Sequence, residues 1–285
     1  MSRWKFAQIL VSSAAMSAFM MAPLAIQGPV AAAERSERVP DLSGAWVSLN
    51  SFGLRSPPSG PGPLGDLQGY SHFGFGVDEA RRAVNSNPWI GDYRSAILTP
   101  WAAAILKEKA ETAIKGEDPF WAQSNCWPGG MASVLWAGPR YFVQTKDVVY
   151  IIYARDHDVR RVYMNQQHSN RHRPSWYGES VGHYEGDVLV VDTLGFNGKA
   201  FIDRYGTPHS DKLHVVERYK VLADGKTLEV TLTYQDPTAF ATTWSAIVRY
   251  NRTEDPLTEE ACSEAAGNPV TGKFYPIPIA ENPDF

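Results

Sequence analysis

The second half of the chain shows the clearest pattern of hydrophobic and polar positions. Between residues 140 and 251, short runs enriched in β-branched and aromatic residues alternate with short polar turns such as Lys146-Asp147 and Glu185-Gly186-Asp187. Turns this short join neighbouring strands directly, so the pattern predicts an antiparallel meander. Eight or nine such strands curl into a barrel of the lipocalin type or a sandwich, because a flat sheet of that size would leave exposed edges. The expected strands span residues 141–145, 148–154, 159–165, 180–184, 188–193, 214–221, 227–235 and 242–250.

One N-terminal helix and an irregular segment are expected before the strands. Thr99 is a good N-cap, Pro100 suits the first helical position, apolar residues follow at near-helical spacing, and Gly116 can end the helix. Glycine and proline interleaved with aromatic residues predict that the chain before Thr99 wraps over a surface, with a short helix compatible with residues 77–84. The expected organisation is residues 1–33 as a signal peptide, 34–139 as a wrapping and helical segment, and 140–285 as the barrel or sandwich, the last two packing as one unit.

The N-terminus has the order of a secretory signal peptide. Arg3 and Lys5 are followed by an uncharged stretch over residues 6–26, and three alanines end at Ala33. A transmembrane anchor is the alternative, but the segment is rich in Ser and Ala and is interrupted by Pro23 and Gly28. We therefore expect a periplasmic or secreted protein, without a membrane span once the signal is removed.

Two cysteines, Cys126 and Cys262, remain after the signal peptide. In an oxidising compartment an even pair indicates a disulfide. A cysteine nucleophile is the alternative, but Cys126 lies in a turn of residues 125–130 that has no flanking base.

The charge of the chain restricts its partners. The formal net charge is -4 and the pI is about 6.0; without residues 1–33, 25 Lys and Arg stand against 31 Asp and Glu. Nucleic acids and anionic membranes require a basic footprint, so neither is expected as a partner.

Strand parity indicates which polar groups face the core. The more apolar face of the 214–221 strand carries Glu217 and Tyr219, and the apolar face of the 227–235 strand carries Tyr234 and continues to Asp236. In the 188–193 strand, Asp192 shares its side with two valines. Buried carboxylates need partners, because an isolated charge in a dry interior is very costly. The candidate partners are Arg160, Arg161, Arg218, His183 and His209.

Two interpretations of these carboxylates remain open. One is a buried ion-pair network that fixes loops to the barrel. The other is an active site, since carboxylates and histidines with shifted pKa values gather at such sites.

Two long loops carry further functional candidates. Residues 166–179 include His168, Trp176 and Tyr177, and residues 194–213 include Phe196 and His209. Long loops with this mix are more often functional than short polar turns. The pair His168 and His172 has the spacing of a metal site on a helix, but Pro174 argues against a helix there, so no metal is expected. The motifs of the common metalloproteases, α/β-hydrolases and nicotinamide enzymes are missing from the sequence, and no organic cofactor is expected.

The stretch from Pro174 to Thr193, PSWYGESVGHYEGDVLVVDT, resembles the signature P-[ST]-W-x-G-x-S-x-G-x-W-E-G-D-T-L-V-V-D-T of a large group of exported bacterial proteins. The similarity continues from Gly195 through Asp236-Pro237 and includes the opening Asp41 to Trp46. The resemblance implies an exported β protein and does not by itself imply a reaction. Residues 165–170 depart from the D-G-R-x-H-P turn of the group, and Tyr184 and Val188 replace its Trp and Thr. These differences point to a different substrate or to the loss of an activity.

Three functions follow from these observations. The first is an enzyme without a cofactor that moves protons on a small hydrophobic or aromatic compound in the mouth of a barrel, as a lyase, isomerase or hydratase. The second is a periplasmic small-molecule binding protein with structural carboxylates, and the third is a component of a cell-envelope assembly.

For the enzyme, the expected catalytic residues are Glu217 or Asp192 as base, His209 or His183 as its partner, and Arg218 or Arg161 as the group that stabilises negative charge. The expected substrate-binding residues are Arg161, His168, Trp176, Tyr177, Phe196, Tyr219, Tyr234 and Asp236.

Overall fold

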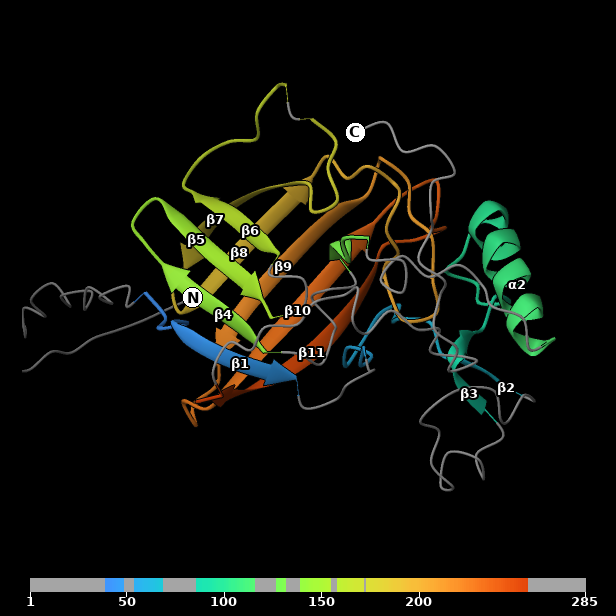
Figure 1. The fold of residues 1–285 in the computed structure, drawn as a ribbon, viewed down its shortest axis with the longest axis horizontal. Coiled ribbons are helices and arrows are strands. Elements are labelled where there is room, and N and C mark those ends of the chain that lie inside the picture. Colours follow the sequence, from blue (N-terminus) through green and yellow to red (C-terminus); the bar gives the residue numbers. More distant parts are fainter. Residues whose placement is uncertain are drawn as a thin grey trace, which may run out of the picture. The chain divides into compact units, whose positions relative to one another are not determined.

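The computed structural model describes residues 39–48, 54–68, 86–115, 127–131, 139–154, 158–171 and 173–255. These residues belong to the compact unit Glu37–Phe285. Their central feature is a closed β-barrel with the strand order β1-β11-β10-β9-β8-β7-β6-β5-β4 (Figure 1). The strands are β1 Gly44–Ser48, β4 Arg140–Gln144, β5 Val148–Tyr153, β6 Val159–Met164, β7 Glu179–Glu185, β8 Val188–Leu194, β9 His214–Val221, β10 Thr227–Gln235 and β11 Trp244–Thr253.

The expected barrel is thus confirmed, and strand β1 closes it. Strand β1 lies between β11 and β4 and pairs antiparallel with both, with Trp46 opposite Arg252 on one side and opposite Arg140 on the other. Trp46 is fully buried and its indole Nε1 donates a hydrogen bond to the carbonyl of Leu42 at 2.8 Å. A segment far from the main strands in sequence therefore completes the sheet and removes its edges.

The expectation of an entirely antiparallel meander is wrong at one place. Strands β6 and β7 run parallel, with Val162 opposite Ser180 and Met164 opposite Gly182. The connection over residues 165–178 is long enough to return the chain to the starting end of β6, so β7 repeats its direction. We call residues 165–178 the crossover.

The inward side chains of the strands form one continuous hydrophobic core. Strand β10 turns Leu228, Val230, Leu232 and Tyr234 inward, each fully buried, and β11 places Trp244 opposite Tyr234. Buried side chains of the loop over residues 195–213 belong to the same core cluster as those of the strands. This loop therefore packs on the barrel core.

Helix α2, Pro100–Ile114, confirms the one expected helix. The backbone N–H of Ala102 donates to the hydroxyl of Thr99, and the N–H of Thr99 donates to the carbonyl of Ala239 at 3.0 Å, between β10 and β11. Leu106 belongs to the barrel core cluster, while Ala110 packs in a second cluster with the hairpin of β2, Asp66–Gln68, and β3, Ser86–Gly91.

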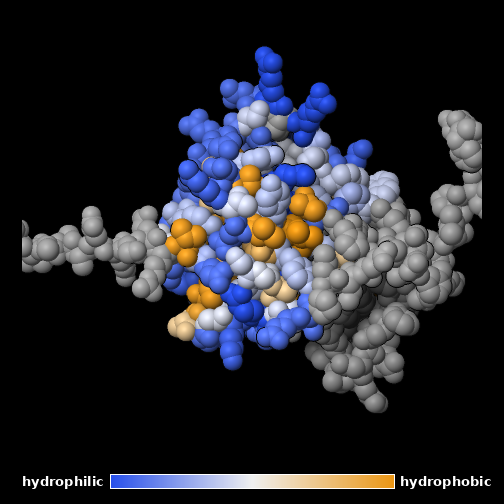
Figure 2. Space-filling view, turned by 60° about the vertical axis from the view of Figure 1, so that its left-hand side comes forward, coloured by the Kyte–Doolittle hydropathy of each residue, from blue (hydrophilic) through white to orange (hydrophobic). Residues whose placement is uncertain are grey.

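Figure 2 brings forward the side of the molecule on which β4 to β6 lie, and it shows hydrophobic side chains among hydrophilic ones. The outward residues of these strands include Val143, Val159 and Tyr163, all exposed, and Ile152, which is half-buried. Because these strands carry apolar residues on both faces, residue type alone cannot tell their inner face from their outer face.

Some expectations fall outside the described residues. These are the signal peptide over residues 1–33, the short helix over residues 77–84, and the disulfide between Cys126 and Cys262. Within the described ranges, no helix combines the length and hydrophobicity needed to cross a membrane.

Candidate functional site

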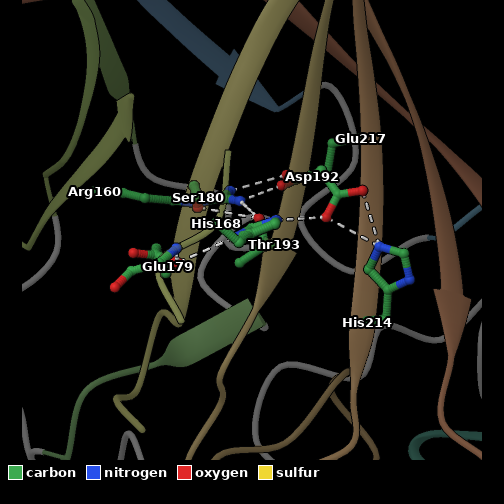
Figure 3. Close-up of polar contacts among 9 residues, drawn as sticks. Arg160, His168, Glu179, Ser180, Asp192, Thr193, His214 and Glu217 are labelled. Carbon is green, nitrogen blue, oxygen red and sulfur yellow. Dashed lines mark hydrogen bonds and ion pairs between the residues drawn. The ribbon is translucent and has the colours of Figure 1, made fainter. Parts of the chain in front are cut away.

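A buried ion pair between Arg160 of β6 and Glu217 of β9 lies inside the barrel (Figure 3). The guanidinium donates to both oxygens of Glu217, with 3.0 Å between Nη1 and Oε1. It also donates to the hydroxyls of Ser180 at 3.0 Å and Thr193 at 2.7 Å. The phenol of Tyr219 donates to Glu217 Oε1 at 2.6 Å. This network spans four neighbouring strands.

The prediction that Glu217 faces the core is confirmed, but its surroundings do not suit a base. Three hydrogen bonds from Arg160 and Tyr219 already occupy its two oxygens. Burial disfavours the charge of Arg160, but Glu217 outweighs this effect, so the pKa of Arg160 lies well above its ordinary value. The pair is a permanent, mutually neutralised structure, and the interpretation as a buried ion-pair network fits it. Tyr219, expected to contact substrate, belongs to the same network.

The expectation that Asp192 faces the core is wrong. Its side chain is 37% exposed, while Leu189, Val191 and Thr193 of the same strand are fully buried and face the interior. The outer face of β8 also carries Val188 and the buried Val190, so both faces of this strand look apolar in sequence. Asp192 therefore lies on the outer wall, behind the Arg160–Glu217 pair and separated from it by the sheet.

Asp192 joins two histidines on that outer wall. Nε2 of His214 lies 3.0 Å from both oxygens of Asp192, and Nε2 of His168 lies 2.9 Å from Oδ1. Nδ1 of His168 lies 3.2 Å from Oε2 of Glu179. We call Glu179, His168, Asp192 and His214 the outer histidine chain (Figure 3). The hydrogen bond to Asp192 raises the pKa of His214, and the hydrogen bonds from His214 and His168 outweigh burial and lower the pKa of Asp192.

Three further expected residues also lie on the outer wall, away from the interior. His183 is exposed, with its Nε2 3.0 Å from Glu185 Oε1. Arg218 is exposed and donates to Glu185 Oε2 at 2.6 Å. Arg161 is exposed on β6, next to the inward Arg160. The side chains of His183, Arg218 and Arg161 point outward, whereas that of Glu217 points into the barrel. Their predicted roles beside a buried carboxylate therefore do not fit the structure.

His209 is buried in the loop that packs on the barrel. Its Nδ1 lies 2.9 Å from the carbonyl oxygen of Ser210, which can only accept, so Nδ1 carries the proton. Burial lowers the pKa of His209, and the hydrogen bond to Ser210 opposes this shift only in part. The ring meets Phe196 edge to face, with centroids 5.7 Å apart. His209 is thus a neutral imidazole in a fixed tautomer, and its basic nitrogen is Nε2.

Nε2 of His209 is a buried acceptor without a hydrogen-bond partner among the residues that the structure describes. The hydroxyl of Tyr234 and the indole Nε1 of Trp244 share this property. The rings of Tyr234 and Trp244 stack with centroids 4.3 Å apart. These three atoms are among the buried side-chain atoms of the described residues that lack a partner, and the hydroxyl of Tyr153 is another. Buried polar atoms nearly always have a partner, so the atoms of His209, Tyr234 and Trp244 call for water or a ligand.

The three orphan atoms belong to residues at one end of the barrel, which we call the capped end. Tyr234 is the last inward residue of β10 and Trp244 begins β11. Asp236, directly after β10, accepts hydrogen bonds from the N–H and hydroxyl of Ser210 at 2.6 and 2.8 Å, which fixes the neighbouring His209 at this end.

The prediction that Asp236 is buried is confirmed. Its oxygens also accept from the N–H groups of Thr238 and Ala239. Asp236 therefore shapes the loop that holds His209, and its bonds leave it poorly suited to contact a substrate.

The aromatic residues of the crossover lie at its end, near the loop of His209. Tyr177 stacks on Tyr153, with centroids 5.9 Å apart, and donates to Asp158. Trp176 meets Trp127 edge to face at 5.4 Å. Both Trp176 and Tyr177 are half-buried. The expected Phe196, by contrast, packs directly on His209.

The sequence predicts Arg160 only as one of five candidate partners of the buried carboxylates, and it predicts no site role for Thr193, Trp244 or His214. Arg160 shares its parity with Val162 and Met164, which was a usable signal for an inward cation. Trp244 pairs with Tyr234 across strands and could have been found from that register. His214 gave no such signal, because its link to Asp192 depends on which face of β8 is outside.

No protein-family model and no curated protein matches this chain. Within the described ranges, no group of three or more His, Cys, Asp and Glu side chains is arranged to hold a metal ion. The site must therefore be interpreted from its own geometry.

Proposed function

We propose that the protein is an enzyme that moves a proton on a small, mainly hydrophobic or aromatic molecule at the capped end of the barrel, with His209 as the base. The observation that carries this proposal is the buried, neutral imidazole with Nδ1–H held by Ser210 and Nε2 left without a partner in the described part of the chain. A base needs a free lone pair, a fixed orientation and a pKa that keeps it unprotonated at neutral pH. His209 meets all three conditions.

The chemistry needs no group beyond the chain and its substrate. Nε2 of His209 takes a proton from the substrate, whose bonding pair stays on the substrate, and the imidazolium then returns the proton to the same or another atom. Isomerase, lyase and hydratase reactions all contain such a step. In this proposal Glu217 keeps its structural pairing with Arg160 and takes no part in proton transfer.

A non-catalytic binding protein is the second candidate. The closed Arg160–Glu217 network favours it, because a carboxylate whose oxygens are already occupied suits a structural role and takes no part in proton transfer. Either function would fit the export that the N-terminal sequence predicts.

Ligand retention and deuterium exchange separate these candidates. The wild-type protein is purified from the periplasm of its own host cell. Small molecules that remain bound to it are extracted and identified by mass spectrometry. The extract is then incubated with protein in D2O, and deuterium uptake is followed. We expect wild-type protein to label a bound compound, and His209→Gln to bind it within a few-fold of wild-type affinity but to label it at least about 100-fold more slowly.

The matched control is His183→Gln, which removes an exposed histidine of the outer wall. It should bind and label like the wild type. A bound compound that wild-type protein does not label would support the binding protein instead. Equal labelling by wild type and His209→Gln would exclude His209 as the base.

A further inference from the structure

We propose that the substrate of this site is a carbonyl compound with an acidic α-hydrogen, and that Tyr234 and Trp244 receive its oxygen. This inference rests on the proposed function, since it assigns the partner atoms of the molecule that His209 deprotonates. It is carried by a separate observation, namely the two orphan donors at the same end of the barrel.

The orphan atoms define what a ligand must offer. The indole Nε1–H of Trp244 can only donate, and the hydroxyl of Tyr234 has no acceptor among the described side chains and backbone groups. Nε2 of His209 can only accept, because Nδ1 holds the proton. A complementary ligand therefore carries an acceptor for two donors and an acidic hydrogen for one base. A carbonyl oxygen has two lone pairs and meets the first requirement with a single atom.

Strand register places these donors at the capped end. Tyr234 pairs with Trp244 on one side and with Val215 on the other, and Val215 pairs with Thr193. These inward residues therefore lie at the same level of the barrel as Thr193, whose hydroxyl accepts a hydrogen bond from the Arg160 guanidinium. Burial raises the pKa of Tyr234, and the negative charges of Glu217 and then of Asp203, in the loop of His209, raise it further.

The surroundings favour an apolar carbonyl compound. Phe240 meets Trp244 edge to face at 5.4 Å, and Phe196 lies against His209. Aromatic rings of this kind supply apolar contact area, while the few polar atoms fix the orientation. A ketone or aldehyde suits an imidazole base better than a carboxylate does, because its α-hydrogen is much more acidic.

Deprotonation of the carbonyl compound by His209 gives an enolate. The α C–H bond breaks and its proton goes to Nε2 of His209. The C–H electron pair forms a carbon–carbon double bond, and the carbonyl π pair moves to oxygen. Tyr234 and Trp244 donate to the resulting enolate oxygen, where hydrogen bonds are stronger than to the neutral carbonyl. Return of the proton to the same carbon gives exchange, and return to a conjugated carbon gives isomerisation.

The test uses the full chain with 2-naphthol as a mimic of an enol and naphthalene as the same shape without oxygen. We expect wild-type protein to bind 2-naphthol at least about tenfold more tightly than naphthalene, and Tyr234→Phe and Trp244→Phe each to remove most of this preference. Because the Tyr234 hydroxyl has no partner within the described ranges, Tyr234→Phe should keep or raise the midpoint of thermal unfolding, so its folding is not in question. Thr233→Val, on the outer face of β10, is the matched control.

A second measurement separates this inference from the proposed function. Deuterium exchange into 2-tetralone, an enolisable aromatic ketone, is followed for wild type and His209→Gln. Exchange that depends on His209, together with equal binding of 2-naphthol and naphthalene, would keep the base and overturn the oxygen site. A preference for 2-naphthol that depends on Tyr234, without exchange, would keep the oxygen site and overturn the base.

Discussion

Arg160 and Glu217 illustrate how a residue inside the barrel can be indispensable without being catalytic. Each neutralises the other in a site without water contact, and Ser180, Thr193 and Tyr219 satisfy further hydrogen-bonding positions. Breaking a buried pair leaves one uncompensated charge, which costs more than the pair itself contributes.

The first prediction concerns Glu217→Gln. This change leaves the Arg160 charge without its counter-ion, so we expect the free energy of unfolding in urea to fall by about 3–5 kcal/mol. Glu185→Gln, at an exposed carboxylate, should change it far less. Full stability of Glu217→Gln with complete loss of deuterium exchange would contradict the structural role of Glu217.

The second prediction concerns the pH dependence of His209. Its pKa in the folded protein lies below the ordinary value of 6.5 because the ring is buried. The base therefore stays unprotonated as the pH falls through 6.5, and the rate of deuterium exchange should decline only below that value. An exchange rate that halves at pH 7 or above would contradict a neutral, buried imidazole.

The same residue affects stability in a defined direction. Because the folded pKa is lowered, His209 takes up its proton more readily in the unfolded chain. Its contribution to stability is therefore present above pH 6.5 and is lost as the pH falls from 6.5 through the folded pKa. The prediction for exchange and this stability effect share one cause, the burial of the ring.

The sequence could locate Glu217, Tyr234 and Asp236 because their strands are apolar on one face and polar on the other. It could not locate Asp192, because β8 is apolar on both faces and parity then gives two equivalent answers. It singled out His209, but not the hydrogen bond to the carbonyl of Ser210 that makes Nε2 the basic atom, nor the bond from Ser210 to Asp236 that holds this loop. These depend on loop geometry that no local pattern encodes.

At the scale of elements, the outer histidine chain fastens the crossover to the barrel wall. His168 comes from the crossover, and its partners Glu179 and Asp192 come from β7 and β8. The crossover also pairs with the loop of His209, because the N–H of Ser175 donates to Gly195 at 3.0 Å and the N–H of Asn197 donates to Ser175 at 2.9 Å. The outer wall and the capped end are thus joined through one segment.

The third prediction is that this fastening depends on pH. The folded pKa of His214 is raised, so its contribution is full below the unfolded value of 6.5 and is lost as the pH rises through the folded pKa. The folded pKa of Asp192 is lowered, so its contribution is present above the unfolded value of 3.8 and is lost as the pH falls through the folded pKa. The outer histidine chain therefore contributes most to the free energy of unfolding between about pH 4 and 6.5.

Urea unfolding of wild type and His214→Gln at several pH values measures this contribution. Because these groups are partly exposed, we expect a difference of about 0.5–1 kcal/mol near pH 5.5, shrinking toward zero above the raised pKa of His214. His183→Gln serves as the control, because His183 is a histidine that does not belong to the outer histidine chain. A difference that grows with rising pH would show that the sign assigned to His214 is wrong.

At the scale of the whole molecule, the barrel depends on a strand that lies far from the rest in sequence. Eight strands of the main run were predictable from alternation and turns, whereas the pairing of β1 with both β4 and β11 was not. Long-range closure has no local signature, and its benefit appears only when the last edge is covered. The parallel β6–β7 pair was missed for the same reason, since strand direction across a long loop is decided by tertiary packing.

The fourth prediction tests this closure. Trp46→Ala removes a fully buried indole between β4 and β11 and should lower the free energy of unfolding by about 3–5 kcal/mol, with one cooperative transition. Trp101→Ala, at a tryptophan of α2 that is 42% exposed, should cost far less. If the two changes had equal effects in urea unfolding, β1 would not be an integral strand of the barrel.

His209 is expected to be a neutral imidazole with its proton on Nδ1 and a basic Nε2 that meets the substrate. Nitrogen-15 NMR of histidine-labelled protein, assigned with His209→Gln, measures both the charge and the tautomer. At pH 7 we expect a neutral ring protonated at Nδ1, with an Nε2 resonance that shifts when 2-naphthol binds. A charged ring, or a proton on Nε2, would contradict it.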